Sequence, residues 1–289
     1  MPTFTHEDHT LAYTEYGEGP RTVVLLHGLL FAQTMHEPLA RRLAKQGNHV
    51  ITLDLLGHGQ SDRPTEMWEY SMVGFGAQIV ALLDHLDVDE AVLFGTSLGA
   101  NSSLEVAAAA PERVRGLVVE MPVLDNALLG CAIGFTPALI AFTFGAPITR
   151  PLSRLAAAVP RRFVPFLPRL GLDLVSQDPK PSASIMQGLF FGRTAPPRAV
   201  RRTLETPALI IGHHRDPIHP FSDAGMLAEE MPNATLMEAD SILELRTRPD
   251  RLMEEIGTFV DACWAPRKAK ARPRTRRPAT GPTKRPVTA

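Results

Sequence analysis

The sequence predicts a doubly wound α/β domain, with a mostly parallel sheet, helices on both of its faces and an inserted helical cap. Two observations carry this prediction. Apolar runs without polar alternation recur along the chain, as is typical of strands buried on both faces. Amphipathic helical stretches separate these runs, and the resulting β-α-β order indicates a parallel sheet. The runs lie at 23–26, 50–53, 91–94, 117–119 and 208–211.

The connecting stretches show apolar side chains at helical spacing. One stripe runs through residues 79–86 and a second through residues 224–231. A third stripe, at residues 252–260, predicts a last helix before Cys263 and Trp264.

The stretch between Glu120 and Pro207 has no strand pattern. Its first part, residues 126–149, carries no charge and is long enough to cross a bilayer. Strands of one sheet flank it on both sides, however, and glycines and prolines interrupt it. We therefore expect an apolar helical cap at 126–205 over a hydrophobic pocket, with the core formed by 1–125 and 206–265.

Composition indicates an ordinary soluble protein. Of 289 residues, 44% are hydrophobic and 21% are charged, which is typical of a chain with a sizeable core. The two cysteines, Cys131 and Cys263, cannot form a disulfide framework, and their spacing suits no metal site. The polar N-terminal stretch carries no apolar signal core, so we expect a cytoplasmic protein.

Residues 266–289 form a basic tail. This segment holds nine Lys or Arg and no acidic residue, which leaves a net charge of −10 on the rest of the chain. Its composition predicts disorder and a solubilising role. Contact with an anionic membrane surface or with nucleic acid is a weaker alternative, since no aromatic residue interrupts the basic run to stack on bases. No obligate protein partner is evident.

The stretch "FGTSLGA" at residues 94–100 follows an apolar run and precedes a helical stretch rich in small residues. This is the context of a G-x-S-x-G elbow, in which a sharp strand-to-helix turn exposes a nucleophilic serine. Ser97 is the candidate nucleophile. Gly95 and Gly99 are expected where neighbouring chains leave no room for side chains.

Four motifs, in this order, resemble those of the α/β-hydrolase fold family over residues 1 to about 265. They are "LLHGLL" (25–30), "DLLGHGQSDRP" (54–64), "GTSLG" (95–99) and "IIGHHRDPIHP" (210–220). The resemblance implies the fold of that family and an acyl-transfer site at the carboxyl ends of the strands.

The resemblance also implies roles for individual residues. The backbone N–H groups of Leu29 and Leu98 would form the oxyanion hole, and Asp216 would be the triad acid, with Asp125 as a second choice. His58 is expected to be structural. The family's dehalogenases and epoxide hydrolases use a carboxylate nucleophile, so a serine at the elbow argues against their chemistry.

The family's usual histidine after the last strand is absent. Ala239 and Asp240 stand where a Gly-His pair is expected, and no histidine follows His219. Three hypotheses remain open. A histidine of the loop "GHHRDPIH" (213, 214 or 219) could act as the base, Asp240 itself could do so if burial raised its pKa, or the protein could bind a ligand without efficient turnover.

The sequence thus predicts a serine hydrolase for an ester or related acyl compound with a hydrophobic moiety, with Ser97, Asp216 and Asp240 as catalytic residues. We expect no metal or organic cofactor, because the sequence contains neither a ligand cluster nor a dinucleotide fingerprint. The contrasting hypothesis is a binding or scaffold protein that keeps the fold. A base within hydrogen-bond reach of the Ser97 hydroxyl would separate the two.

Overall fold

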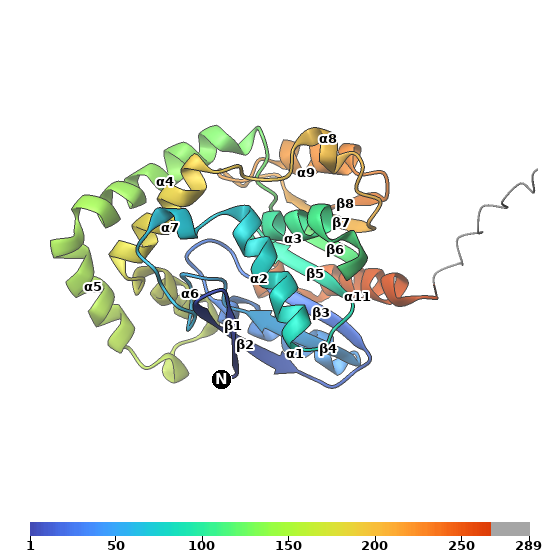
Figure 1. The fold of residues 1–289 in the computed structure, drawn as a ribbon, viewed down its shortest axis with the longest axis horizontal. Helices are drawn as coiled ribbons and strands as arrows, with labels where there is room; N and C mark the ends of the chain where they lie inside the picture. Colours follow the sequence, from blue (N-terminus) through green and yellow to red (C-terminus); the bar gives the residue numbers. More distant parts are fainter. Residues whose placement is uncertain (267–289) are drawn as a thin grey trace, which may run out of the picture.

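One eight-stranded sheet organises the chain in the computed structural model, which describes residues 1–266 (Figure 1). The predicted basic tail lies, apart from Pro266, outside the described residues. Strands β1 and β2 pair antiparallel, β2 joins β4 antiparallel, and all other neighbours are parallel. In spatial order the strands are β1 (Thr3–His6), β2 (His9–Tyr16), β4 (Asn48–Leu53), β3 (Arg21–Leu26), β5 (Ala91–Thr96), β6 (Val114–Glu120), β7 (Ala208–His213) and β8 (Ala234–Ala239).

The predicted doubly wound fold is confirmed by the two apolar layers that sandwich the sheet. Along β3, Val24 and Leu26 belong to one buried cluster, whereas Val23 and Leu25 belong to the other. Both faces are therefore dry, which explains the unbroken apolar runs. Helices α2 (Met72–His85), α3 (Leu98–Ala109) and α9 (Phe221–Glu230) contribute to the first layer, and α1 (Glu37–Lys45) and α11 (Asp250–Trp264) to the second.

The antiparallel pair β1 and β2 was not predicted from the sequence. Strand β2 mixes buried residues with half-exposed and exposed ones at its two ends, so its hydrophobic pattern is weak. Glu7, with φ of 51°, forms the tight connection between the two strands. An edge hairpin of this kind leaves little apolar periodicity for sequence analysis to detect.

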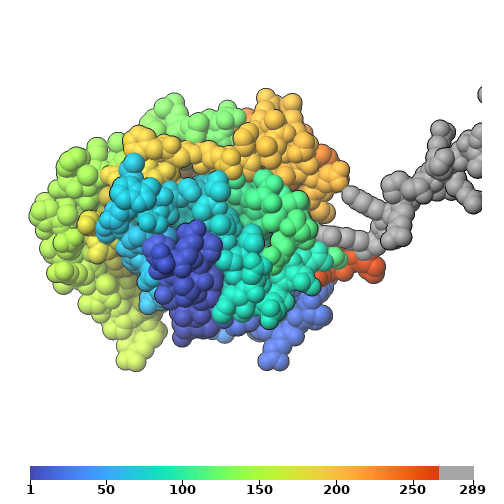
Figure 2. Space-filling view, in the orientation of Figure 1, coloured from blue at the N-terminus to red at the C-terminus, as the bar shows by residue number. Residues whose placement is uncertain are grey.

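The insertion between β6 and β7 is helical in the structure. It contains α4 (Ala127–Phe144), α5 (Ala146–Ala158), α6 (Phe166–Val175), α7 (Pro179–Phe191) and α8 (Arg198–Arg201). Helices α4 and α5 form the outer rim on the left of the view, away from the C-terminal helix α11 (Figures 1 and 2). The remaining short helices are α10 (Glu244–Thr247) and the 3₁₀ turns Gln33–His36, Met67–Glu69, Pro111–Arg113 and Arg161–Phe163.

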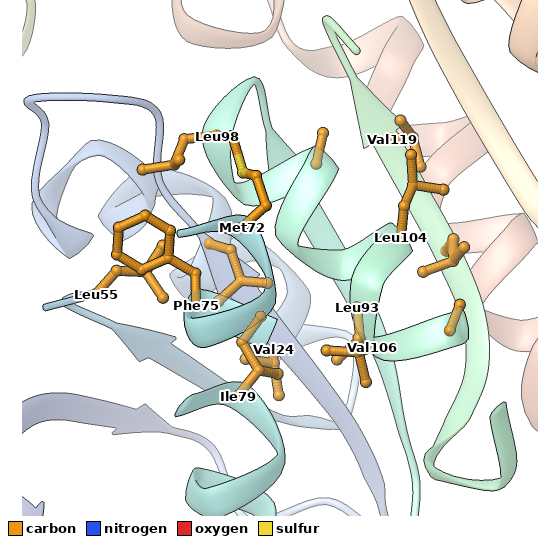
Figure 3. Packing of buried hydrophobic residues seen from close by; sticks show 14 of the residues in the cluster. Val24, Leu55, Met72, Phe75, Ile79, Leu93, Leu98, Leu104, Val106 and Val119 are labelled. Carbon is orange, nitrogen blue, oxygen red and sulfur yellow. The ribbon is translucent and has the colours of Figure 1, made fainter. Parts of the chain in front are cut away.

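The larger apolar layer packs two helices against the middle of the sheet (Figure 3). Phe75 and Ile79 of α2 and Leu104 of α3 lie with Val24 and Leu93 of the central strands, and all five are fully buried. Side chains of this size each contribute about 1.5–3 kcal/mol when removed from water. This layer holds the N-terminus of α3 against the sheet.

A buried histidine lies at the start of α1, in contact with the second layer. The Nε2 of His36 donates a hydrogen bond to the Leu26 carbonyl at 3.1 Å, and its ring packs near Phe94. Burial lowers the pKa of His36 to about 3; the positive charge of Arg246 acts in the same direction, and Glu120 opposes it. The imidazole is therefore neutral in the folded protein at any pH near neutrality.

We expect this histidine to make stability depend on pH. Its pKa rises from about 3 to the ordinary 6.5 on unfolding, so the unfolded chain binds the proton first. Stability is full above pH 6.5 and falls as the pH drops toward 3. The loss at pH 5 from this one group is about 2 kcal/mol.

Urea unfolding of the wild type and His36→Gln at pH 7 and pH 5 measures this effect. The variant should lose less stability than the wild type between the two pH values. His214→Gln, at an exposed histidine, serves as the matched control. Equal losses for the wild type and His36→Gln would show that His36 does not carry the pH dependence.

Candidate active site

Ser97 occupies a strained turn between β5 and α3. Its backbone has φ of 53° and ψ of −106°, a region that side-chain-bearing residues rarely adopt. The Ser97 N–H donates to the Glu120 carbonyl of β6 at 2.9 Å, which anchors the turn to the neighbouring strand. Strain held in place by surrounding structure is typical of functional sites.

The two glycines of the elbow leave room for adjacent backbone, as the sequence predicted. A Cβ on Gly95 would lie 2.1 Å from the carbonyl carbon of Gly99. A Cβ on Gly99 would lie 2.3 Å from the Leu26 carbonyl oxygen. Neither position can hold a larger residue without moving β3 or α3.

A histidine from the loop after β7 reaches the serine. The Nε2 of His219 lies 2.9 Å from the Ser97 Oγ, and its Nδ1 lies 2.8 Å from Asp216 Oδ2. The second carboxylate oxygen, Oδ1, accepts the N–H groups of Ile218 at 2.8 Å and His219 at 2.9 Å. The same carboxylate thus shapes the turn and orients the imidazole ring.

Electrostatics favour one protonation pattern in this loop. Burial would raise the pKa of Asp216, but the hydrogen bond and charge of His219, helped by the two backbone N–H groups, bring it below its usual value. An ionised Asp216 accepts the Nδ1 proton of His219. The Nε2 lone pair is then free to accept the proton of the Ser97 hydroxyl.

Two backbone N–H groups flank Ser97 without hydrogen-bond partners among residues 1–266. Leu98 is the first residue of α3, where the N–H has no partner within the helix. Leu29 follows Gly28, and a Cβ on Gly28 would lie 3.9 Å from the Ser97 Cβ. Both leucines border the same cavity as Ser97. Free N–H donors beside the nucleophile are one requirement of an oxyanion hole.

The other candidate bases point elsewhere. Asp240 follows β8 with a side chain 72% exposed and lies 3.9 Å from Arg251. It makes no hydrogen bond to Ser97, whose Oγ contacts His219 instead. His214 is exposed, stacks on Phe221 and lies 3.1 Å from Glu238. The structure therefore brings together Ser97, Asp216 and His219 and leaves Asp240 outside the group, because the Asp240 side chain is exposed to solvent beside Arg251.

The remaining polar candidates have structural surroundings. His213 is buried, with its Nε2 3.8 Å from Glu120, and burial lowers its pKa. His58 is also buried, and its Nδ1 donates to the Leu56 carbonyl at 3.0 Å. Asp125 has a side chain 70% exposed and lies 3.9 Å from Arg201 at the rim of the cavity.

A buried ion pair lies directly beneath the elbow. Arg246 donates to both oxygens of Glu120, at 2.7 and 2.8 Å, and Thr96 donates to the same carboxylate at 2.6 Å. Both charged side chains are almost fully buried. Burial would raise the pKa of Glu120, but the charge of Arg246 and its hydrogen bonds bring it below the ordinary value. The pair links β5, β6 and α10 just below Ser97.

Ser97 opens into an apolar cavity of about 510 Å³ beneath the inserted helices. Its wall is formed by α4, α7 and the start of α3, with Leu98, Leu128, Cys131, Phe135, Met186 and Leu189 among the lining residues. Arg193, Arg198 and Arg201 border the side formed by α8 and the segment that precedes it. Within residues 1–266 no group of three or more metal-ligating side chains converges.

Comparison with known proteins agrees with this fold. Residues 21–137 match a family described as alpha/beta hydrolase fold. Haloalkane dehalogenase 1 of Mycobacterium tuberculosis is 30% identical over 230 residues, which cover 73% of this chain and 73% of that protein. The 3-oxoadipate enol-lactonase 2 of Acinetobacter baylyi is 26% identical over 83% of this chain and 89% of its own length.

Other relatives match over shorter segments, and solved structures share the fold. The matched segments span 36% and 53% of two further haloalkane dehalogenases, from Mycolicibacterium paratuberculosis and Mycobacterium marinum. A hydrolase structure from Pseudomonas aeruginosa superimposes with a TM-score of 0.75 at 21% identity, over 90% of this chain and 97% of that one. At that identity the likeness shows the fold alone.

We expect the loss of one partner of the Glu120–Arg246 pair to lower the stability strongly. Removing one partner of a buried ion pair leaves an uncompensated charge, which costs about 3–5 kcal/mol. Arg246→Met should therefore lower the free energy of unfolding by that amount in urea titrations. The double variant Arg246→Met with Glu120→Leu should recover most of the loss, because it removes both charges. A loss under about 1 kcal/mol for the single variant would contradict this account.

Proposed function

Because this chain belongs to the α/β-hydrolase fold family, and because a haloalkane dehalogenase and an enol-lactonase are among its relatives, we propose that it is a serine hydrolase for an ester or related acyl compound with a hydrophobic moiety. The observation that carries the proposal is the chain of hydrogen bonds from Asp216 through His219 to the Ser97 hydroxyl. Ser-His-Asp constellations are recognised by this geometry and by the roles of their members.

Acylation follows from the positions of the polar groups. The Ser97 Oγ attacks the carbonyl carbon of the substrate, and its proton moves to the Nε2 of His219. Asp216 holds the Nδ1 proton and stabilises the imidazolium that forms. The N–H groups of Leu29 and Leu98 bind the oxyanion, and the collapsing intermediate releases the alcohol, which takes the proton from Nε2.

Deacylation reverses the roles with water as the nucleophile. His219 Nε2 accepts a proton from a water molecule, which attacks the acyl-enzyme carbonyl. The second oxyanion is held by the same two N–H groups. Its collapse breaks the bond to the Ser97 Oγ, the Nε2 proton returns to that oxygen, and the carboxylic acid departs.

The apolar cavity supports a substrate with a hydrophobic moiety. Its wall is dominated by aliphatic and aromatic side chains, and the polar groups are confined to Ser97 and the arginine-bearing rim. Sites of this kind fix a ligand through shape and a few polar contacts. The proposal also differs from the activity named for the dehalogenase relatives, because this chain carries a serine at the elbow.

The alternative of a non-catalytic binding protein is less favoured. It was motivated by the absence of a histidine after the last strand. A base at 2.9 Å from the Ser97 Oγ removes that motive, because the distance lies within the range for proton transfer.

Kinetics on p-nitrophenyl butyrate and labelling with a fluorophosphonate probe test the proposal. Ser97→Ala and His219→Gln should lower kcat by roughly 10³-fold or more, and Asp216→Asn by roughly 10²–10⁴-fold through loss of the correct tautomer. The probe should label the wild type and fail to label Ser97→Ala.

Asp240→Asn is the matched control for Asp216→Asn, because Asp240 lies apart from Ser97. It should keep kcat within about threefold of the wild type, since surface substitutions away from a site change little. If His219→Gln retained wild-type turnover, or if Asp240→Asn abolished it, the assignment of His219 as the base would fail. An unlabelled wild type would favour the binding-protein hypothesis.

The cavity also predicts a preference for longer acyl chains. An octanoyl ester should have a higher kcat/KM than an acetyl ester, since each buried methylene contributes about 0.8 kcal/mol. Phe135→Ala should lower kcat/KM for the octanoyl ester by about tenfold and leave the acetyl ester nearly unchanged. Equal kcat/KM for the two esters in the wild type would contradict this reading of the cavity.

A further inference from the structure

The outer surface of α4 and α5 is apolar and uncovered. Helix α4 has a mean hydropathy of 1.9 over 18 residues, yet only 6% of it is buried. Its exposed side chains recur at helical spacing and include Ile133 and Phe144, which are 68% and 79% exposed. Helix α5 continues the pattern. We call this surface the outer apolar face and define it by Leu129, Ile133, Ile140, Phe144, Ile148, Leu152 and Leu155.

The charges in the segment that carries the outer apolar face, residues 126–172, are all positive. The sequence has no acidic residue from 126 to 172, whereas it has five arginines there. Two of them are neutralised, since Arg161 pairs with Asp173 and Arg169 with Glu37. The other three, Arg150, Arg154 and Arg162, are exposed and make no ion pair within the described part of the chain.

Helix α4 is long and apolar enough to cross a membrane, but its packing against the rest of the protein excludes a membrane-spanning position. A Cβ on Gly130 would lie 3.1 Å from the Pro217 carbonyl oxygen, so one side of the helix rests on the loop that holds His219. Leu128 and Phe135 line the cavity. Moreover, the chain leaves β6 for the insertion and returns as β7, and these two strands are parallel neighbours in the sheet. Among residues 1–266, α4 is the one helix long and apolar enough to cross a membrane. If α4 crossed the membrane alone, β6 and β7 would lie on opposite sides of it and could not pair.

We propose that the outer apolar face docks on the surface of an anionic phospholipid bilayer, with α4 and α5 lying in the plane of the interface. An amphipathic helical segment with an exposed apolar surface and exposed arginines as its only unpaired charges is the chemistry that such an interface selects. The apolar side chains enter the boundary of headgroups and acyl chains. Arg150, Arg154 and Arg162 meet the phosphates.

A second copy of the chain is the competing occupant, and the charges disfavour it. A symmetric dimer through the outer apolar face would bring together two copies of a segment whose unpaired charges are all positive, since a two-fold interface uses the same patch on both subunits. No acidic side chain of this segment could compensate them. A bilayer with anionic headgroups supplies the missing negative charge.

Docking in this orientation would bring the cavity to the lipid. Helix α4 carries the outer apolar face on one side and Leu128, Cys131 and Phe135 of the cavity wall on the other. An ester dissolved in the bilayer could then reach Ser97 along apolar surface. This route rests on the proposed function, whereas the docking itself does not.

Vesicle co-sedimentation of the full chain tests the docking. The vesicles consist of phosphatidylcholine alone or of phosphatidylcholine with about 30% phosphatidylglycerol, and binding is measured at low and at high salt. The wild type should bind the anionic vesicles more tightly and remain partly bound at high salt, because insertion of apolar side chains is not screened. The variant Ile133→Ser/Ile140→Ser/Phe144→Ser should bind at least about tenfold more weakly at high salt.

The arginines and matched controls complete the design. Arg150→Gln/Arg154→Gln/Arg162→Gln should weaken binding to anionic vesicles by roughly tenfold to hundredfold and leave binding to neutral vesicles unchanged. Val73→Ser/Leu236→Ser/Ile242→Ser changes three exposed apolar residues outside the insertion and should bind like the wild type. All variants keep the basic tail, so binding through the tail alone would leave them indistinguishable, and that outcome would overturn the proposal.

Two further measurements keep the result unambiguous. Light scattering after gel filtration reports the oligomeric state, and a wild-type dimer that the triple serine variant converts to a monomer would assign the face to a second copy instead. Hydrolysis of water-soluble p-nitrophenyl butyrate should be unchanged in every variant, because none of these residues lines the cavity. Failure of the docking is thereby distinguished from failure of the proposed function.

Discussion

The parallel pairing of β5, β6 and β7 is the constraint on which the site depends. Parallel strands end at the same edge of a sheet, so the turn after β5, the end of β6 and the loop after β7 meet in space although they are far apart in the sequence. Ser97, Glu120 and Asp216 come from these three segments. The pairing is maintained by apolar layers on both faces, and the site lies where those layers end.

Two features around Ser97 cost free energy in the folded protein: a strained backbone and the burial of an ion pair. Ser97 has a strained backbone, and the Glu120–Arg246 pair beneath it is withdrawn from water. Such features persist only where surrounding contacts determine them. Here the pair is satisfied by four hydrogen bonds that include Thr96, and the elbow is anchored to β6 by the Ser97 N–H. The strained turn and the buried ion pair are therefore both held at the ends of β5 and β6, where Ser97 lies.

The position of His219 illustrates how a short turn can replace a distant loop. Asp216 accepts two backbone N–H groups of its own turn with one oxygen and the imidazole with the other. Pro217 lies within this turn and Pro220 follows it, and both restrict the backbone. Asp216 and His219 thus belong to one tetrapeptide, and the turn itself fixes their orientation relative to each other. Only the contact between His219 and Ser97 requires the folded sheet.

The sequence by itself determined the fold class and predicted the elbow, because apolar periodicity and the steric demands on Gly95 and Gly99 are local properties. The oxyanion-hole segments were predicted only through the resemblance to a family. It also placed His219 among the open choices for the base, beside His213, His214 and Asp240, since a histidine close to Asp216 in the chain is a local signal. Only the tertiary structure decided which ring reaches Ser97 and that Asp240 does not. The hairpin of β1 and β2 and the exposure of α4 were likewise decided by long-range packing, because a weak alternating pattern and an uncharged helix are each compatible with more than one environment.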